Sequence, residues 1–302
     1  MASQQSQALT DMYRDWTGRM GTGTMELPEI RDMFEGWGDL ASEPEDMEYA
    51  EINLGGVRCL RAMEKGLEDK MRVLLCFHGG GFVCGSVDSH RKMFAHIAKK
   101  MGCKAAIVDY DRTPDNRHPG ILNQCVAAYA DLLAKGYKPE HIAFVGDSAG
   151  GNLSISVLVL AKLLGYPMPA ATIPLSPWLD MEPTAETMQT KADVDAFVAP
   201  DAVRFMASMY LDAGQDAAGP LASPLYADLS GLPPMLIQVG GHEALLGDSE
   251  RLEANARKAG VDVTLQVFPE MQHVFQLMAG KAPEADEAID KIVAWTKPAL
   301  GL

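Results

Sequence analysis

The serine at position 148 has the neighbours of a nucleophile held in a strand-to-helix turn. Residues 146–151 read GDSAGG, a G-x-S-x-G pattern, and they follow the apolar run at residues 142–145. Such a turn presents a serine hydroxyl but is crowded, so a Cβ atom at Gly146 or Gly150 would collide with the strand or the helix. A serine hydroxyl is a weak nucleophile until a base removes its proton. The pattern predicts acyl transfer through Ser148.

A second glycine-rich loop supplies another part of that chemistry. Residues 78–82 read HGGGF and follow the apolar run at residues 73–77. Attack on an ester carbonyl creates an oxyanion, and fixed backbone N–H groups must already point at it. Three consecutive glycines let the backbone approach that oxygen closely. We expect His78 to fix this loop through hydrogen bonds. Neither glycine-rich loop carries the Gly-Lys-Ser/Thr of a nucleotide-binding P-loop.

The base that Ser148 needs comes later in the chain. Two of the seven histidines, His242 and His273, follow the serine. His273 comes after the strand-like residues 261–268 and a short loop, which is where the base belongs in the order Ser, Asp or Glu, His. His242 would need an acid earlier in the chain, and no strand end offers one in register. We therefore assign His273 as the base.

The acid should follow the strand before the one that carries the base. Glu243 comes directly after the strand-like residues 234–241, and we assign it as the acid that orients His273. Asp248 is the competing acid, one helical turn later. We expect Asp248 instead to cap the helix that runs through residues 249–252.

The elements that must position these residues alternate between strands and helices. A hairpin turning at Gly55-Gly56 is predicted over residues 47–64. Strands are then predicted at 72–77, 104–109, 141–147, 170–175, 234–240 and 261–268, and helices at 89–101, 120–135, 149–164, 248–259 and 284–297. This alternation predicts an α/β fold with a mostly parallel central sheet flanked by helices.

Two regions without strands interrupt this pattern. Helical spacing occurs at residues 4–20 and 28–38, and again at residues 186–196 and 200–212. We interpret both regions as a helical cap over the loop-bearing edge of the sheet, where ligands bind in open α/β folds. The chain then divides into N-terminal cap helices (1–45), a first part of the core (46–182), a cap insertion (183–215) and a second part of the core (216–302).

Four residues are candidates for a substrate pocket. Phe82 adjoins residues 78–81, which we call the oxyanion loop. Trp178 follows the strand predicted at residues 170–175. Met206 and Met209 lie in the cap insertion, where the flexible methionine side chain suits an adaptable apolar pocket. A cap that restricts the pocket favours small or medium acyl groups over long triglycerides.

The pairing of HGGG with GDSAGG resembles the hormone-sensitive-lipase family of esterases, in its bacterial GDSAG branch. The likeness runs from about residue 45 to the C-terminus and includes PWLD at residues 177–180 and MQHVF at residues 271–275. The resemblance implies an α/β-hydrolase fold with a helical cap and a homodimer formed through the edge strand before His273. It also implies that the oxyanion donors are the N–H groups of Gly80, Gly81 and Ala149.

The sequence departs from the family pattern at two places. The acid of the family is usually an Asp in an Asp-Pro-Leu context, whereas Glu243 stands in Glu-Ala-Leu here. The stretch YDRTPD at residues 110–115 replaces the usual YRLAPE and places an acidic residue at the arginine position. This stretch supports the loop beneath the site and does not bear on the Ser, Glu and His assignments.

These observations predict a serine carboxylesterase that works through an acyl-enzyme intermediate and needs neither a metal nor a cofactor. The same residues would serve a lactone hydrolase or an N-acyl/acetyl hydrolase, and no residue excludes that alternative. A ligand-binding receptor on an inactive hydrolase fold, as in the plant gibberellin receptors, is disfavoured because those receptors lack the histidine that His273 supplies here.

The amino-acid composition restricts the classes of binding partner and the cellular compartment that we expect. The 302 residues include 26 basic and 41 acidic side chains, a net charge of −15, which disfavours nucleic acid and anionic membranes as partners. No apolar run approaches the ~18 residues of a membrane span. The five cysteines lack metal-binding spacing, and several lie in apolar runs, so we expect buried free thiols and a reducing compartment. The N-terminus has no signal-peptide pattern, which predicts a cytoplasmic protein.

Overall fold

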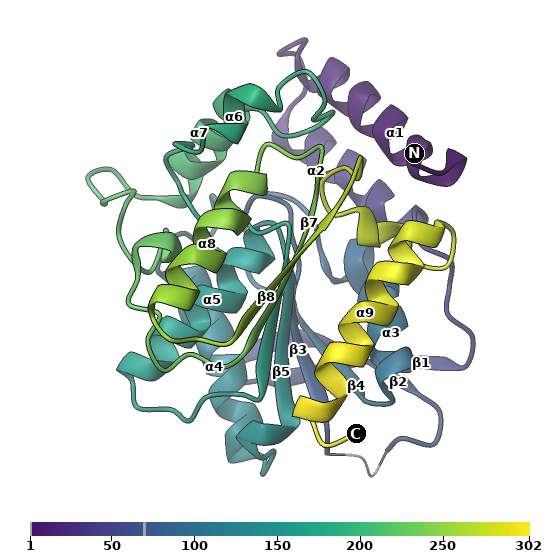
Figure 1. Cartoon of the computed structure of the whole chain (residues 1–302), viewed down its shortest axis with the longest axis vertical. Helices are drawn as coiled ribbons and strands as arrows, with labels where there is room; N and C mark the ends of the chain where they lie inside the picture. Colours follow the sequence, from purple (N-terminus) through teal and green to yellow (C-terminus); the bar gives the residue numbers. More distant parts are fainter. Residues whose placement is uncertain (1, 69–70) are drawn as a thin grey trace.

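The chain folds around an eight-stranded sheet with helices on both faces (Figure 1). The structure is a computed structural model that describes residues 2–68 and 71–302. The strand order is β1-β2-β4-β3-β5-β6-β7-β8. β2 pairs antiparallel with β1 and β4, and all the other neighbours are parallel. The predicted mostly parallel α/β sheet is confirmed.

The strand bounds follow the predicted ones within two residues. They are β1 Met47–Leu54, β2 Val57–Glu64, β3 Val73–Phe77, β4 Lys104–Val108, β5 Ile142–Asp147, β6 Ala171–Leu175, β7 Met235–Gly240 and β8 Val263–Phe268. Every residue of β3, β4, β5, β6 and β7 is buried. These strands read as apolar runs because helices cover both faces of the sheet.

Helices cover the two faces in separate groups (Figure 1). α3 (Val87–Met101) and α9 (Pro283–Ala299) pack together on one face. α4 (Gly120–Ala134), α5 (Ala149–Leu163) and α8 (Leu246–Lys258) lie on the other. Each face thus has its own apolar core, and the sheet forms the floor of both.

The hairpin between β1 and β2 turns at Gly55 and Gly56, as predicted. Their φ angles are +62° and +88°, which glycine adopts readily and which suit a two-residue hairpin turn. Gly55 also has no room for a side chain, because an added Cβ atom would lie 2.4 Å from the carbonyl oxygen of Ala127 in α4.

Four helices gather at one end of the sheet (Figure 1). They are α1 (Gln4–Met20), α2 (Leu27–Glu35), α6 (Thr187–Thr190) and α7 (Pro200–Tyr210). α1 and α2 come from the start of the chain, and α6 and α7 come from the segment between β6 and β7. Two regions far apart in the sequence therefore meet over the same edge of the sheet.

The helix predicted over residues 186–196 is wrong beyond its first turn. Only α6, Thr187–Thr190, forms, and the chain then turns. Oδ1 of Asp195 accepts the N–H groups of Phe197 at 2.8 Å and Val198 at 2.9 Å. Such side-chain-to-backbone bonds compete with a helix for the same N–H groups, so the turn is favoured there.

The prediction of buried free thiols is confirmed, since all five cysteines are free and buried. In the part of the chain that the structure describes, no helix has the length and apolar character needed to cross a membrane.

Candidate active site

Ser148 lies in a sharp turn between β5 and α5. Its φ is +54°, a value that non-glycine residues rarely adopt and that marks a strained turn. The N–H of Ser148 donates to the carbonyl oxygen of Leu175 at 2.9 Å. A Cβ atom at Gly146 would lie 2.1 Å from the carbonyl oxygen of Gly150, and one at Gly150 would lie 1.9 Å from that of Phe77. The expected need for glycine at both positions is confirmed.

The loop that follows β3 is fastened to the end of β5. The N–H of Gly79 donates to Oδ1 of Asp147 at 3.1 Å. A Cβ atom at Gly79 would lie 2.2 Å from Oδ2 of the same carboxylate, so the two segments are in direct contact. The hydroxyl of Tyr110 donates to the carbonyl oxygen of His78 at 2.7 Å. These bonds fix the loop beside the Ser148 turn.

Two buried histidines stabilise this loop. Nδ1 of His78 lies 2.8 Å from the carbonyl oxygen of Gly79, and its ring stacks on Tyr110 with centroids 4.2 Å apart. Burial, together with the nearby charge of His90, holds the pKa of His78 well below its ordinary value. Nε2 of His90 lies 3.1 Å from Oδ2 of Asp147. His78 therefore has the structural place that the sequence predicts.

The three residues expected to supply oxyanion donors lie on the two segments next to the cavity at Ser148. Gly80 and Gly81 line the same cavity as the serine, and Ala149 is the first residue of α5. The first N–H groups of a helix have no partner within the helix, and the positive end of its dipole favours negative charge. The loop after β3 and the start of α5 therefore both lie next to Ser148.

The structure brings the predicted base and acid together. Nδ1 of His273 lies 2.8 Å from Oε2 of Glu243, and the two side chains come from the loops after β8 and β7. The hydroxyl of Tyr13, in α1, donates to the backbone carbonyl oxygen of His273 at 2.9 Å. Because Nδ1 is engaged by the carboxylate, Nε2 is the ring nitrogen left for another partner.

The second oxygen of Glu243 is held by the fold. Oε1 accepts the N–H of Gly240 at 2.5 Å and the hydroxyl of Ser176 at 2.7 Å. The oxygen of Ser176 in turn accepts the N–H of Val274 at 3.2 Å. The Ser176 hydroxyl therefore links the acid to the residue that follows His273.

The charges around His273 make it a stronger base than burial alone would allow. Burial lowers the pKa of its imidazole, but the hydrogen bond and charge of Glu243, with the charges of Asp195 and Asp147, outweigh burial and raise the pKa above its ordinary value. The positively charged form is thus stabilised at a nearly buried position.

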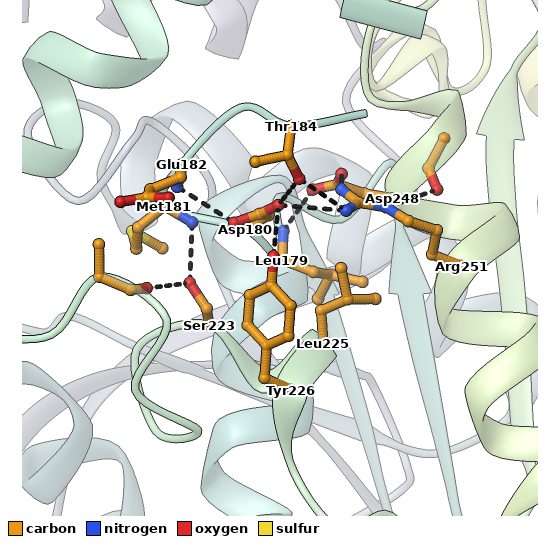
Figure 2. Close-up of polar contacts among 12 residues, drawn as sticks. Leu179, Asp180, Met181, Glu182, Thr184, Ser223, Leu225, Tyr226, Asp248 and Arg251 are labelled. Atoms are coloured by element: carbon orange, nitrogen blue, oxygen red, sulfur yellow. Dashed lines mark hydrogen bonds and ion pairs between the residues drawn. The ribbon is translucent and has the colours of Figure 1, made fainter. Parts of the chain in front are cut away.

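Asp248 belongs to a different polar cluster (Figure 2). Its Oδ2 accepts the N–H of Leu179 at 2.8 Å, and its Oδ1 lies 2.5 Å from Nη2 of Arg251. The expectation that it caps a helix is wrong, because α8 begins at Leu246 and this carboxylate fastens the loop after β6 to that helix. Burial raises the pKa of Asp248 to about 6, although the Leu179 N–H and Arg251 oppose the shift.

Arg251 also ties a second buried carboxylate into this cluster. Its Nη1 lies 3.2 Å from Oδ2 of Asp180, which also accepts the hydroxyl of Tyr226 at 3.0 Å. Figure 2 shows these groups between the loop after β6 and α8. One guanidinium therefore serves two buried carboxylates, and the cluster braces the loop that carries Trp178.

A cavity of about 470 Å³ opens at Ser148. Its walls come from the Ser148 turn, the oxyanion loop, the His273 loop, α1, α2 and α7. Most of the lining is apolar, with Met20, Ile30, Phe34, Val203 and Phe205 among the residues contributed by the helices. The acidic lining residues are Asp147 and Asp201, and His273 is the basic one.

Two of the four expected pocket residues line this cavity, namely Trp178 and Met206. Phe82 does not. It has a φ of +63° and is fully buried, with its ring stacked on Tyr210 at a centroid distance of 3.8 Å. Met209 does not either, because the part of α7 that faces the cavity ends at Met206, and Met209 packs against the neighbouring apolar core.

Several residues around the site were not predicted from the sequence. Ser176 directly follows β6, so the rule that found Glu243 at a strand end could also have found it. Asp147 stands inside the GDSAGG motif, but nothing in its position predicts a bond to Gly79. Tyr13 comes from α1 and Asp195 from the segment between α6 and α7, and only the folded arrangement brings them to the loops that carry His273 and Glu243.

Comparisons with known proteins agree with this geometry. The family model described as the alpha/beta hydrolase fold matches residues 74–277. An acetyl-hydrolase from Streptomyces hygroscopicus is 36% identical over 267 residues, which cover 88% of this chain and 87% of that protein. An esterase from Acinetobacter venetianus is 33% identical over 241 residues, covering 80% and 79%.

A solved structure extends the similarity to the whole chain. The crystal structure of an esterase from the bacterial hormone-sensitive lipase family superimposes with a TM-score of 0.94 and 39% sequence identity. The match covers 99% of this chain and 99% of that one. The similarity therefore includes α1, α2, α6 and α7 as well as the sheet.

Proposed function

This chain belongs to the hormone-sensitive-lipase family of α/β-hydrolases and is a carboxylic ester hydrolase, and we propose that Ser148 is its nucleophile. His273 is the base in this proposal, and Glu243 is the acid that orients it. The observation that carries the proposal is the buried contact between Glu243 and His273 in a site whose cavity also contains Ser148 and the glycines of the oxyanion loop.

The reaction proceeds in two halves. His273 takes the proton of the Ser148 hydroxyl through Nε2 while the serine oxygen attacks the ester carbonyl. The protonated His273 then gives its proton to the leaving alcohol, and an acyl-enzyme remains. A water molecule, activated by His273 in the same way, releases the carboxylic acid. Glu243 stays ionised throughout and stabilises the imidazolium.

The oxyanion of each tetrahedral intermediate binds to backbone donors. In this proposal these are the N–H groups of Gly80, Gly81 and Ala149, which are fixed in place before substrate arrives. Such pre-positioned donors stabilise the transition state more than the ground state, and loss of one typically costs about 3–4 kcal/mol in the activation barrier.

The pocket supports small-to-medium, uncharged acyl groups as the substrate class. In this proposal the cap, residues 1–45 and 183–215, closes the pocket, and Trp178 and Met206 contact the substrate. The volume of about 470 Å³ lies toward the low end of the usual range for ligand pockets, about 300–1,000 Å³. The apolar walls favour hydrocarbon chains, and the carboxylates of Asp147 and Asp201 disfavour anionic substrates.

A panel of activated esters with graded acyl length, together with a lactone and an anilide, tests this function. We expect the highest kcat/KM on short or medium acyl esters. The Ser148→Ala variant should fold normally and lose ester hydrolysis. Retained turnover in that variant would refute the role of Ser148, and highest activity on the lactone would favour the lactone hydrolase instead.

Two further features are proposals of the same kind. We propose a homodimer formed through β8, an edge strand whose Val267 is exposed. We also propose a cytoplasmic location, which the five buried free thiols support because thiols stay reduced in the cytosol.

A further inference from the structure

A short segment of the cap, residues 194–198, is fastened to the loop that carries the base. We call this segment the cap strap. Oε1 of Gln272 accepts the N–H of Ala196 at 2.9 Å, and Nε2 of the same side chain donates to the carbonyl oxygen of Val194 at 2.8 Å. Gln272 directly precedes His273, so the strap and the base loop are joined by two hydrogen bonds.

The cap strap is also fastened to the loop that carries the acid. Oδ2 of Asp195 accepts the N–H of Ala244 at 2.6 Å, and Ala244 directly follows Glu243. The carbonyl oxygen of Ala244 accepts the hydroxyl of Thr187 in α6 at 2.6 Å. Both backbone polar groups of the residue next to the acid are therefore held by cap residues.

The hydrogen bonds of Asp195 show which protonation state of its side chain the surrounding backbone favours. Oδ1 accepts the N–H groups of Phe197 and Val198, and Oδ2 accepts that of Ala244. A carboxylate can accept all three bonds, whereas an amide in its place could offer only one oxygen. Burial raises the pKa of Asp195 above its ordinary value, although these three N–H groups and His273 oppose the shift. The three N–H donors favour the ionised carboxylate.

Aromatic packing holds the cap strap beside His273. The ring of Phe197 stacks on Tyr13 with centroids 4.3 Å apart and on His273 with centroids 6.1 Å apart. The hydroxyl of Thr17 in α1 donates to the carbonyl oxygen of Ala196 at 3.0 Å. The strap is therefore fixed between α1 and the two loops of the site.

We propose that Asp195 is a positioning residue for ester hydrolysis, because it anchors the acid loop at Ala244 and adds a negative charge next to His273. This inference rests on the proposed roles of Ser148 and His273. When the Ser148 proton moves to Nε2 of His273, the new positive charge is stabilised by Asp195 as well as by Glu243. Both carboxylates stay ionised, and no proton passes to Asp195.

The groups that set the charge environment of His273 come from each element packed against it. Glu243 follows β7, Asp147 ends β5 and Asp195 comes from the cap strap, and all three raise the pKa of His273 against the effect of burial. The hydroxyl of Tyr13 contacts the backbone of His273 and stays protonated, because burial raises its pKa well above the ordinary value. Removal of Asp195 therefore leaves two of the three charges in place.

The test is the pH dependence of kcat/KM for three variants. Asp195→Asn removes the charge and the bond to Ala244, and Asp195→Glu keeps the charge. Asp193→Asn is the control, because it removes an exposed carboxylate just before the cap strap. We expect Asp195→Asn to move the acidic limb, which reports protonation of His273, about half a unit to one unit toward lower pH and to lower kcat about tenfold. Asp195→Glu should leave the limb in place, and Asp193→Asn should resemble wild type.

The pH at which the acidic limb of the kcat/KM profile falls does not depend on how much of the sample is folded. A partly unfolded variant therefore still gives a result. Should Asp195→Asn yield no active enzyme, a limb shifted to lower pH in Asp195→Glu would contradict the proposal on its own. An unmoved limb in Asp195→Asn, or an equal shift in the control, would also overturn it. In either case an inactive Ser148→Ala variant would leave the proposed function standing, whereas an active one would refute that function.

Discussion

Nδ1 of His273 lies 2.8 Å from Oε2 of Glu243, and the two residues are only 2% and 0% exposed. A hydrogen bond in such a site is stronger than in water, because the surroundings have a low dielectric constant. The carboxylate uses one oxygen for the base and gives the other to Gly240 and Ser176. The fold therefore fixes both the direction of the acid and the ring nitrogen that it binds.

Glu243→Gln should lower kcat by roughly 10³–10⁴-fold, since an amide cannot stabilise the imidazolium and can favour the wrong tautomer. Asp248→Asn should change kcat by less than about threefold, because Asp248 bonds to Leu179 and Arg251 rather than to His273. Steady-state kinetics on one activated ester compares the two. A larger loss in Asp248→Asn would overturn the assignment of the acid.

Ser176→Ala should lower kcat about tenfold and the free energy of unfolding by about 1–3 kcal/mol. The substitution removes the hydrogen bond to Glu243 and leaves the N–H of Val274 without its acceptor. Ser154→Ala is the matched control, since this buried serine donates to the carbonyl oxygen of Gly151 within α5. The control should lose stability but not kcat. Equal losses of kcat in both variants would mean that Ser176 contributes only to folding.

Met206→Ala should shift the preferred substrate toward longer acyl chains. An added Cβ atom at Gly81 would lie 2.1 Å from Sδ of Met206, so this side chain covers the oxyanion loop. Each additional CH₂ group that the enlarged pocket buries contributes about 0.8 kcal/mol, or about fourfold in kcat/KM. Met209→Ala, on the same helix but outside the cavity, should keep the wild-type profile. The prediction fails if both variants shift alike.

The cluster around Asp248 makes the stability of the fold depend on pH. Folding raises the pKa of Asp248 from 3.8 to about 6. For a carboxyl group shifted upward, the stabilising contribution is complete below the unfolded pKa and is lost as the pH rises through the folded value. At about 1.4 kcal/mol per pKa unit, wild type should lose about 3 kcal/mol relative to Asp248→Asn between pH 3 and pH 7.

Denaturant unfolding of wild type and Asp248→Asn across this pH range measures the effect. Asp193→Asn controls for the loss of one negative charge at an exposed position. A constant difference between wild type and Asp248→Asn, or one that grows in favour of wild type as the pH rises, would contradict the prediction.

The sheet and the loops at its carboxyl edge could be predicted because their signals are local. Gly146 and Gly150 are required by atoms within a few residues of them or on the adjacent strand, and the order of strands in the chain indicates where Glu243 and His273 fall. The structure confirms that these two meet. The same reasoning applied to β6 would have reached Ser176, which lies at an equivalent strand end.

The predictions from the sequence fail at residues whose conformation is determined by tertiary contacts. The turn at Asp195 replaces a predicted helix because its carboxylate binds N–H groups of the cap strap and of the acid loop. Phe82 adjoins the oxyanion loop in sequence, yet it packs on Tyr210 in the core. No periodicity or motif reports which cap residue reaches which loop, so Tyr13 and Asp195 could be found only in the folded molecule.

The central claim is that the hydroxyl of Ser148 attacks the substrate. Labelling with a fluorophosphonate, followed by intact-protein mass spectrometry and peptide mapping, tests it most directly, because this reagent reacts with activated serines. The account predicts one label per chain, on Ser148, with loss of ester hydrolysis in proportion to labelling. Complete inactivation with the label on another residue, or full activity in enzyme labelled at Ser148, would contradict it.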